Sequence, residues 1–416
     1  MQENQTVKHK NRLGDSMNAQ MEVRFPELPA FTAASPLPPF EGNNGTVTYG
    51  FEGADTESAN AYRSALDELG FMRIFENSIA ECTFTTFRKN ELSVRVAHYP
   101  TIKLLKIIAT RGEEYVTYEN RNNGDEPYWT PAITQIGRKG ALQWSPGMSY
   151  IIRNTDGSFV IFDGGPRDDE DVDHLMTFLR AHQPGVQKPV IAMWLFSHPH
   201  QDHLNLAKAF WDKYHDDIDL RAVAFNFPNM EATVIGKGND VHAEKVQSVI
   251  DHHNDILRRI AEYFPNTKRY TPHTGDRYVM PGYTIDTLVC YEDIYPDKFS
   301  DVNYFSLAWM IRSENKKVLL LGDTGKRISQ RMADVYRFEL KCDIMQICHH
   351  GNFGATMDLY RYADPDICLW PEKERMLKSE PFILGTKQGF EFNYWIWHSR
   401  KRLHFHTSIT TSFELD

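Results

Sequence analysis

Four potential metal ligands stand within six positions of the chain, directly after a strongly apolar run. The stretch PVIAMWLFSHPHQDH ends in His198, His200, Asp202 and His203. A continuous apolar run of this kind is typical of a strand that is buried on both faces. Loops at the ends of such strands often carry reactive side chains, because the sheet beneath them is rigid. The stretch therefore predicts a β-sheet with a metal site at one edge.

Three other strand-like runs also end in residues that can bind or orient a metal. VIFDGG places Asp163 at the end of an early run, and KVLLLGD places Asp323 at the end of a later one. DIMQICHHG ends in His349 and His350. Imidazole nitrogens and carboxylate oxygens are the ligands that zinc and similar ions accept. We therefore expect these strand ends to meet at one edge of the fold.

The residue types fit two metal ions better than one. His198 and His200 are alternate residues of an extended turn and can direct two imidazoles to one ion. Asp202 and His203 begin the next predicted helix and can turn toward a second ion, and Asp323 can bridge the two. Two ions about 3.5–4 Å apart lower the pKa of a bridging water and stabilise the attacking and leaving oxygens of an ester.

The HPHQDH run resembles the HxHxDH signature of the metallo-β-lactamase superfamily. The similarity is greatest to the hydrolase-like domain of the competence protein for DNA uptake and to phosphorylcholine esterases. It covers about residues 132–416 and implies an αββα sandwich, an α/β fold with two mixed sheets between layers of helices. The further motifs that carry it are Asp163-Gly164-Gly165, Asn303-Tyr-Phe-Ser306-Leu307, Gly322-Asp323 and His349-His350-Gly351.

The resemblance also implies a ligand set for each ion. One ion would be held by three histidines, the second by an aspartate and a histidine, and a further aspartate would lie between them. These residues are, in that order, His198, His200 and His349, then Asp202 and His203, then Asp323.

The two adjacent histidines of the HHG motif have different expected roles. His349 is favoured as the ligand, because relatives with His-Trp-Gly or His-Tyr-Gly keep the first position. His350 is then expected to contact a ligand or the substrate. Asp163 is expected to orient the metal loop rather than to bind metal.

Many members of the superfamily supply one more histidine between the HxHxDH turn and the bridging aspartate. The candidates in this chain are His242, His252, His253 and His273. His252 and His253 fall within a predicted helix and are expected to face solvent. His273 lies in the loop YTPHTGDRY and is favoured. If His273 is not a ligand, the second ion is expected to bind weakly or not at all.

The pattern of elements divides the chain into three parts. Residues 1–45 are polar and then rich in proline, which predicts a flexible arm or a tail that lies over another domain. Residues 46–130 alternate as a strand, a helix capped by Thr56 and three further strands, which predicts a small α+β domain of unknown role. Residues 131–416 form the hydrolase domain.

Composition limits the classes of function. The net charge of −10 disfavours a general nucleic-acid coat, although a nuclease with a local basic groove stays compatible. The five cysteines have no CxxC spacing, which favours a reducing compartment. No apolar leader and no run of about 18 apolar residues is found, so we expect a cytoplasmic protein without a membrane span.

These observations predict a metal-dependent hydrolase that uses a metal-bridged hydroxide on a phosphodiester or related ester. Asp202, His350 and His273 are the expected catalytic residues. Two zinc ions fit the ligands, and manganese or iron fit as well. The alternatives are a lactamase- or lactonase-like hydrolase of C–N or C–O bonds, or a metal-stabilised module that binds without catalysis. The expected partner is a small-molecule or ester substrate, and the sequence does not determine the oligomeric state.

Overall fold

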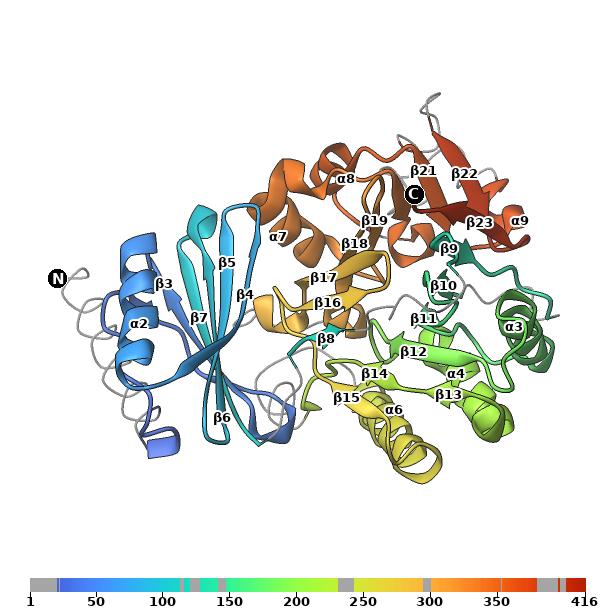
Figure 1. The fold of residues 1–416 in the computed structure, drawn as a ribbon. Coiled ribbons are helices and arrows are strands. Elements are labelled where there is room, and N and C mark those ends of the chain that lie inside the picture. Colours follow the sequence, from blue (N-terminus) through green and yellow to red (C-terminus); the bar gives the residue numbers. More distant parts are fainter. Residues whose placement is uncertain are drawn as a thin grey trace.

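The computed structural model describes residues 21, 23–112, 116–119, 128–140, 147–230, 243–294, 301–352, 354–379, 396 and 402–416. A small domain with one sheet lies beside a larger domain with two sheets (Figure 1). His242, one of the candidate ligands, falls outside the described residues.

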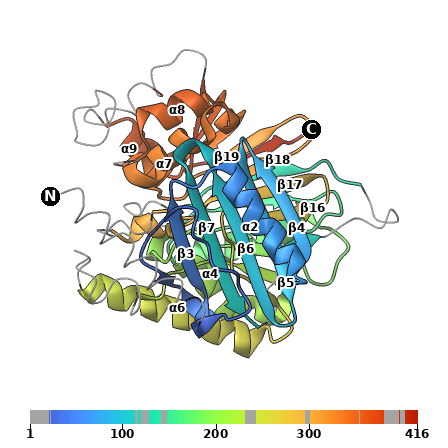
Figure 2. The ribbon, with the colours of Figure 1, turned by 90° about the vertical axis from the view of Figure 1, so that its left-hand side faces the viewer.

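The small domain is a seven-stranded antiparallel sheet with a helix on one face, as Figure 2 shows. The strand order is β1-β3-β7-β6-β5-β4, with β2 paired to β3. One strand, β4, was not predicted, because most of its residues are exposed and give no apolar alternation. The elements are β1 (Ser35–Pro36), β2 (Phe40–Glu41), β3 (Val47–Glu52), α2 (Thr56–Glu68), β4 (Met72–Ile79), β5 (Cys82–Lys89), β6 (Leu92–Tyr99) and β7 (Leu104–Arg111).

Helix α2 begins at Thr56, but its cap is the preceding residue. The side chain of Asp55 accepts a hydrogen bond from the backbone N–H of Ser58 at 2.8 Å. The Ser58 hydroxyl accepts one in return from the Asp55 backbone N–H at 3.2 Å. This reciprocal pair satisfies two N–H groups at the helix start. Tyr62 and Leu66 on the inner face then pack against the sheet.

The described part of the predicted N-terminal arm packs against this sheet. Strands β1 and β2 both pair with β3, and Phe25, Leu28 and Phe31 are buried in the core of the small domain. Proline-rich composition alone does not reveal these apolar residues, which join the same buried cluster as α2.

The larger domain contains two eight-stranded sheets. The first has the order β15-β14-β12-β11-β10-β9-β23, with β13 paired to β12. From β11 to β15 its neighbouring strands run parallel, so their carboxyl ends share one edge. The strands are β9 (Ala132–Gln135), β10 (Tyr150–Arg153), β11 (Phe159–Phe162), β12 (Val190–Leu195), β13 (Asp219–Leu220), β14 (Ala222–Ala224), β15 (Lys268–Tyr270) and β23 (Thr411–Glu414).

The second of these sheets has the order β22-β21-β20-β19-β18-β17-β16-β8. Strands β19 to β22 are parallel neighbours, so their carboxyl ends also share an edge. The strands are β8 (Tyr118–Glu119), β16 (Arg277–Met280), β17 (Tyr283–Val289), β18 (Ala308–Arg312), β19 (Lys317–Leu320), β20 (Ile344–Gln346), β21 (Ile367–Trp370) and β22 (Leu403–His406).

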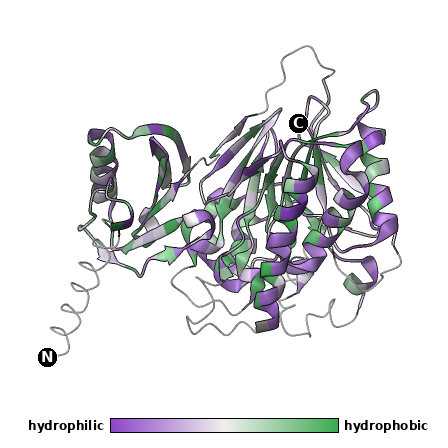
Figure 3. Cartoon of the chain, turned by 90° about the horizontal axis from the view of Figure 1, so that it is seen from below, coloured by the Kyte–Doolittle hydropathy of each residue, from purple (hydrophilic) through white to green (hydrophobic). Residues whose placement is uncertain are grey.

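The two sheets pack face to face between helices. Residues from both sheets, such as Val160 and Trp309, share one buried cluster between them. The outer face of the first sheet packs on helices α3, α4 and α6, and that of the second packs on α7 and α8. Figure 3, seen from below, shows both hydrophilic and hydrophobic residues on the helices of the larger domain that face the viewer, as helices with one solvent face require.

The expected α/β class, an αββα sandwich preceded by a small α+β domain, is confirmed. In the described part of the chain, no helix has the length and apolar character needed to cross a membrane. The helices of the sandwich are α3 (Asp169–His182), α4 (Gln201–Tyr214), α6 (Ala243–Tyr263), α7 (Lys326–Tyr336), α8 (Met357–Ala363) and α9 (Glu374–Leu377).

Buried ionic and polar contacts hold the small domain against the larger one. The Lys106 ammonium on β7 lies 3.1 Å from an Asp293 carboxylate oxygen, and the Tyr99 hydroxyl donates to the same oxygen at 2.8 Å. Arg95 on β6 lies 3.4 Å from Asp276. All these side chains are almost fully buried. Removing one partner would leave a buried charge unpaired, so the two domains are expected to stay docked.

Acid is expected to weaken this docking. Burial raises the pKa of Glu292 and of Asp293, but nearby His273 and Lys106 respectively outweigh it, so both pKa values lie below their ordinary range. Their contribution to stability is therefore complete above the unfolded-state pKa of about 4 and is lost as the pH falls below it. Urea unfolding followed from pH 7 to pH 3 measures the effect.

Asp293→Asn is the control for this expectation. The variant should be less stable at pH 7, and its free energy of unfolding should change less steeply with pH than that of the wild type between pH 5 and pH 3. The expectation would be contradicted if the free energy of unfolding changed equally with pH in the two proteins.

Candidate metal centre

The HPHQDH loop connects the end of β12 to the start of α4. His200 is the residue before the helix, and Asp202 and His203 lie in its first turn. Nε2 of His198 lies 2.9 Å from Nδ1 of His200. The loop therefore brings the two imidazoles of the extended turn together, as the sequence predicted.

Asp163 fixes this loop through three contacts. One carboxylate oxygen accepts from the backbone N–H of Ser197 at 2.7 Å, and the other accepts from the Ser197 hydroxyl at 2.7 Å. The second oxygen also lies 2.8 Å from Nδ1 of His203. A carboxylate on one imidazole nitrogen directs the other nitrogen toward a metal. The expectation that Asp163 orients the metal loop is confirmed.

The second sheet brings Asp323 to the same place. Asp323 follows β19, and its backbone N–H donates to the Ser306 hydroxyl at 3.2 Å. The backbone N–H of Leu307 donates to the Ser197 carbonyl at 3.0 Å. The Asn-x-x-Ser-Leu motif therefore ties the two metal loops to each other. A Cβ at Gly322 would lie 2.9 Å from the Ser197 Cβ, so this close approach requires glycine.

The structure distinguishes the two histidines of the HHG motif. Nε2 of His350 lies 3.2 Å from Asp202 and 3.3 Å from Asp323. Nδ1 of His350 lies 2.8 Å from the Pro371 carbonyl, so it donates there and leaves Nε2 as an electron-pair donor. Nε2 of His349 lies 3.9 Å from Asp323 and 3.2 Å from the side-chain nitrogen of Asn303. This geometry favours His350 as the ligand, whereas the sequence favoured His349.

The backbone of the HHG motif is held in an unusual conformation. His349 and His350 have φ angles of 50° and 53°, in the left-handed region that non-glycine residues rarely adopt. The Asn352 backbone N–H donates to the His349 carbonyl and stabilises the turn. This conformation lets the side chains of His349 and His350 point in different directions. A regular helix or strand pattern does not predict this.

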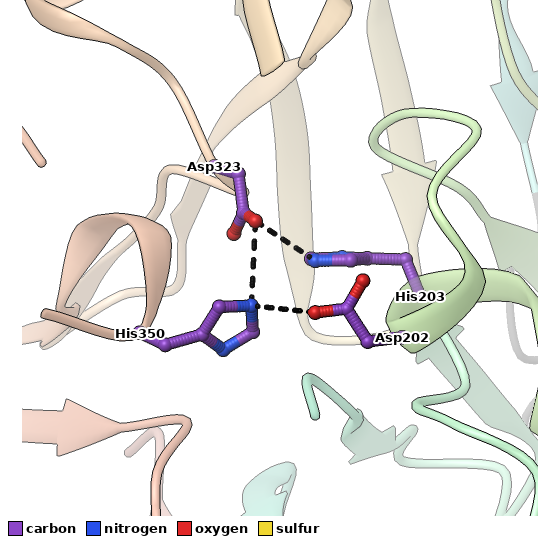
Figure 4. Close-up of side chains that lie close together, drawn as sticks. All are labelled: Asp202, His203, Asp323 and His350. Atoms are coloured by element: carbon purple, nitrogen blue, oxygen red, sulfur yellow. Dashed lines mark ion pairs between the residues drawn. The ribbon is translucent and has the colours of Figure 1, made fainter. Parts of the chain in front are cut away.

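The residues present fit a pair of metal ions that share Asp323. One group comprises His198, His200 and Asp323, and another comprises Asp202, His203, Asp323 and His350 (Figure 4). Four distances between candidate ligand atoms within these groups range from 2.9 to 3.7 Å. Zinc bonds of 2.0–2.1 Å in a tetrahedron place ligand atoms about 3.3 Å apart.

Unpaired atoms support the same interpretation. Nε2 of His203, Nε2 of His350 and Oδ1 of Asp323 are buried and make no hydrogen bond of good geometry among the described residues, although the two nitrogens lie 3.2–3.3 Å from carboxylate oxygens of the same ligand group. Buried polar atoms are nearly always paired, and a metal ion satisfies such atoms as ligands.

The electrostatics of the cluster call for positive charge. Burial raises the pKa of Asp323, but the charges of His350 and His203 outweigh it and hold the pKa well below its usual range. Burial lowers the pKa of His350, but Asp323 and Asp202 reverse this and raise it to about 10. Buried carboxylates thus attract protons onto these histidines. A divalent cation supplies the same charge and displaces those protons on binding.

The candidate histidines that the structure describes, His252, His253 and His273, lie outside both ligand groups. His273 is buried, its Nδ1 lies 2.7 Å from Glu292, and it belongs to neither ligand group. Its backbone N–H donates to Asp276 at 2.9 Å, so both of these contacts lie within the larger domain. His252 is only 8% exposed and His253 is half-buried, so the expectation that both face solvent is wrong. The helical pattern was read correctly, but α4 packs against this face of α6.

Sequence reasoning did not identify Pro371 as the carbonyl that orients His350. It also did not separate His350 from His349. The contacts that decide both points join residues far apart in the chain, and no local pattern signals them.

Comparisons with known proteins give structural likenesses only. No family model matches the chain, and no curated protein matches it. Zinc-bound PqqB from Methylobacterium extorquens has a TM-score of 0.39 and 9% identity over 67% of this chain and 99% of that chain. The metallo-β-lactamase fold protein YhfI from Bacillus subtilis has a TM-score of 0.34 and 14% identity over 57% and 85% of the two chains.

CmlA, a diiron β-hydroxylase from Streptomyces venezuelae, has a TM-score of 0.38 and 12% identity over 69% of this chain. The match spans 54% of the CmlA chain, about half of its length. Because each of these TM-scores is below 0.5, the likenesses carry no argument about metal or substrate.

Substitution of each histidine of the HHG motif tests the ligand assignment. His350→Ala should lose about one equivalent of metal per chain, because its Nε2 faces both Asp202 and Asp323. His349→Ala should keep the wild-type metal content. Elemental analysis of both purified variants measures this, and loss of metal in His349→Ala alone would reverse the assignment.

Proposed function

We propose that this protein is a metal-dependent hydrolase with two divalent ions, most naturally zinc, and that its substrate is a phosphodiester or a related ester. The observation that carries the proposal is the convergence of two ligand groups on one shared carboxylate, Asp323. Two ions held there would activate water and stabilise the charge on an ester in its transition state.

The protein residues have separate roles in this proposal. His198 and His200 bind as neutral imidazoles, since burial lowers the pKa of each. Asp202 and His350 bind the second ion, with His203 held toward it by Asp163. Asp323 is the shared ligand.

The opening of the site lies beside Asp202 and His349. Their side chains are 26% and 23% exposed, whereas that of Asp323 is 2% exposed. A substrate therefore reaches the ions from this side. His349 and its neighbour Asn303 lie where the ester enters, so His349 acts in substrate contact rather than as a ligand.

A phosphodiester is favoured over a lactam or lactone by charge. Two cations match a transition state that carries two negative charges, whereas a lactam or lactone develops only one. The substitution that tests this proposal is Asp323→Ala, because the shared ligand has no substitute among the described residues.

Asp323→Ala should lower both metal content and hydrolysis of bis-p-nitrophenyl phosphate, the latter by about a hundredfold or more. Elemental analysis and release of p-nitrophenol measure the two effects on the same samples. Lys341→Ala, which removes an exposed ion pair with Asp364, is the matched control and should change neither. Hydrolysis of a lactam or lactone without any phosphodiester turnover in the wild type would contradict the assigned substrate class.

A further inference from the structure

A groove of about 430 Å³ lies along α6 beside the metal loop. Gln201, which follows the ligand His200 in the sequence, lines one side of it. Five residues of α6 line the groove with it, at spacings that place them on one helix face. They are Glu244, Gln247, Ser248, Asp251 and His252. The groove therefore adjoins the metal centre without being part of either ligand group.

The contacts of His252, which lines this groove, fix its ring tautomer. The Lys208 ammonium lies 2.9 Å from its Nδ1. An ammonium group can only donate, so Nδ1 accepts and the ring proton lies on Nε2. Burial and the charge of Lys208 lower the pKa of His252 to about 4, so the ring is neutral at pH 7. Asp255 lies 3.2 Å from the Lys208 ammonium and holds it in place.

The Nε2–H group of His252 has no partner in the part of the chain that the structure describes. Nε2 is buried, and among the described residues nothing accepts its hydrogen bond. An unpaired buried donor is unfavourable, and such groups are retained where a ligand completes the pairing. Gln201, the residue after His200, lines the same groove as His252. The unpaired donor therefore belongs to a residue of the groove beside the metal loop.

We propose that the α6 groove is a subsite for the ester bound at the metal centre, and that Nε2–H of His252 donates a hydrogen bond to an oxygen of that ester. Lys208 and Asp255 are positioning residues, because they fix the tautomer that makes Nε2 a donor. The ligand class is an oxyanion or ester oxygen, which only accepts. This inference rests on the proposed hydrolase function.

The test compares four metal-loaded full-length proteins. They are the wild type, His252→Phe, His252→Gln and Lys208→Met. His252→Phe keeps ring volume without a donor, His252→Gln restores an N–H donor, and Lys208→Met keeps the aliphatic stem without the charge. Metal content, melting temperature and the Kd for inorganic phosphate by calorimetry are measured for each, with kcat and KM for bis-p-nitrophenyl phosphate.

Loss of one hydrogen bond to phosphate should weaken binding about tenfold in His252→Phe, at unchanged metal content. His252→Gln should recover most of this loss. Nitrogen NMR of the His252 ring should show the Nε2–H tautomer in the wild type, and the Nδ1–H tautomer should become populated in Lys208→Met. A purely structural role for His252 would lower the melting temperature and leave the Kd for phosphate unchanged.

The outcomes separate the two proposals. Wild-type protein without bound metal or turnover would overturn the hydrolase function. Unchanged phosphate binding in metal-loaded His252→Phe would overturn only the role of His252. If His252→Phe does not fold, the tautomer decides, since an Nδ1–H ring in the wild type would also overturn that role.

Discussion

The carboxylate of Asp323 joins the two sheets of the larger domain at the edge where the ligand groups meet. Asp163 and the HPHQDH loop come from the ends of β11 and β12 in one sheet, whereas Asp323 and His350 come from the ends of β19 and β20 in the other. His203 and His350 both lie within 3.3 Å of the same Asp323 oxygen. The site therefore depends on the two sheets packing face to face in one register, which the apolar cluster between them provides.

Much of the site could be predicted because strand ends are visible in the sequence. The apolar run before His198 and the short run before Asp323 each signal a buried strand, and parallel strands bring their ends to one edge. The choice between His349 and His350 could not be made in this way. Neighbouring residues in a left-handed turn diverge according to contacts with Pro371 and Asn303, which lie far away in sequence.

The fold, like the site, could be predicted only where a local sequence pattern signals it. The core of the small domain follows from alternation, but β4 is mostly exposed and carried no such signal. His273 was favoured as a ligand because it lies in a loop beside Gly275, yet its Nδ1 lies 2.7 Å from Glu292. This contact joins two loops of the larger domain, and no local pattern signals it. Burial of His252 likewise depends on α4, which periodicity within α6 cannot reveal.

The path of the chain between the sheets has a consequence for synthesis. Strand β8 belongs to the second sheet, β9 to β15 build the first, β16 to β22 return to the second, and β23 closes the first by pairing with β9. β9 is therefore made early, but one of its two partners emerges from the ribosome after every other strand of both sheets. Until then β9 presents an unpaired edge, the feature through which sheet proteins most readily associate with one another. This edge is covered only after β23 has left the ribosome and paired with β9.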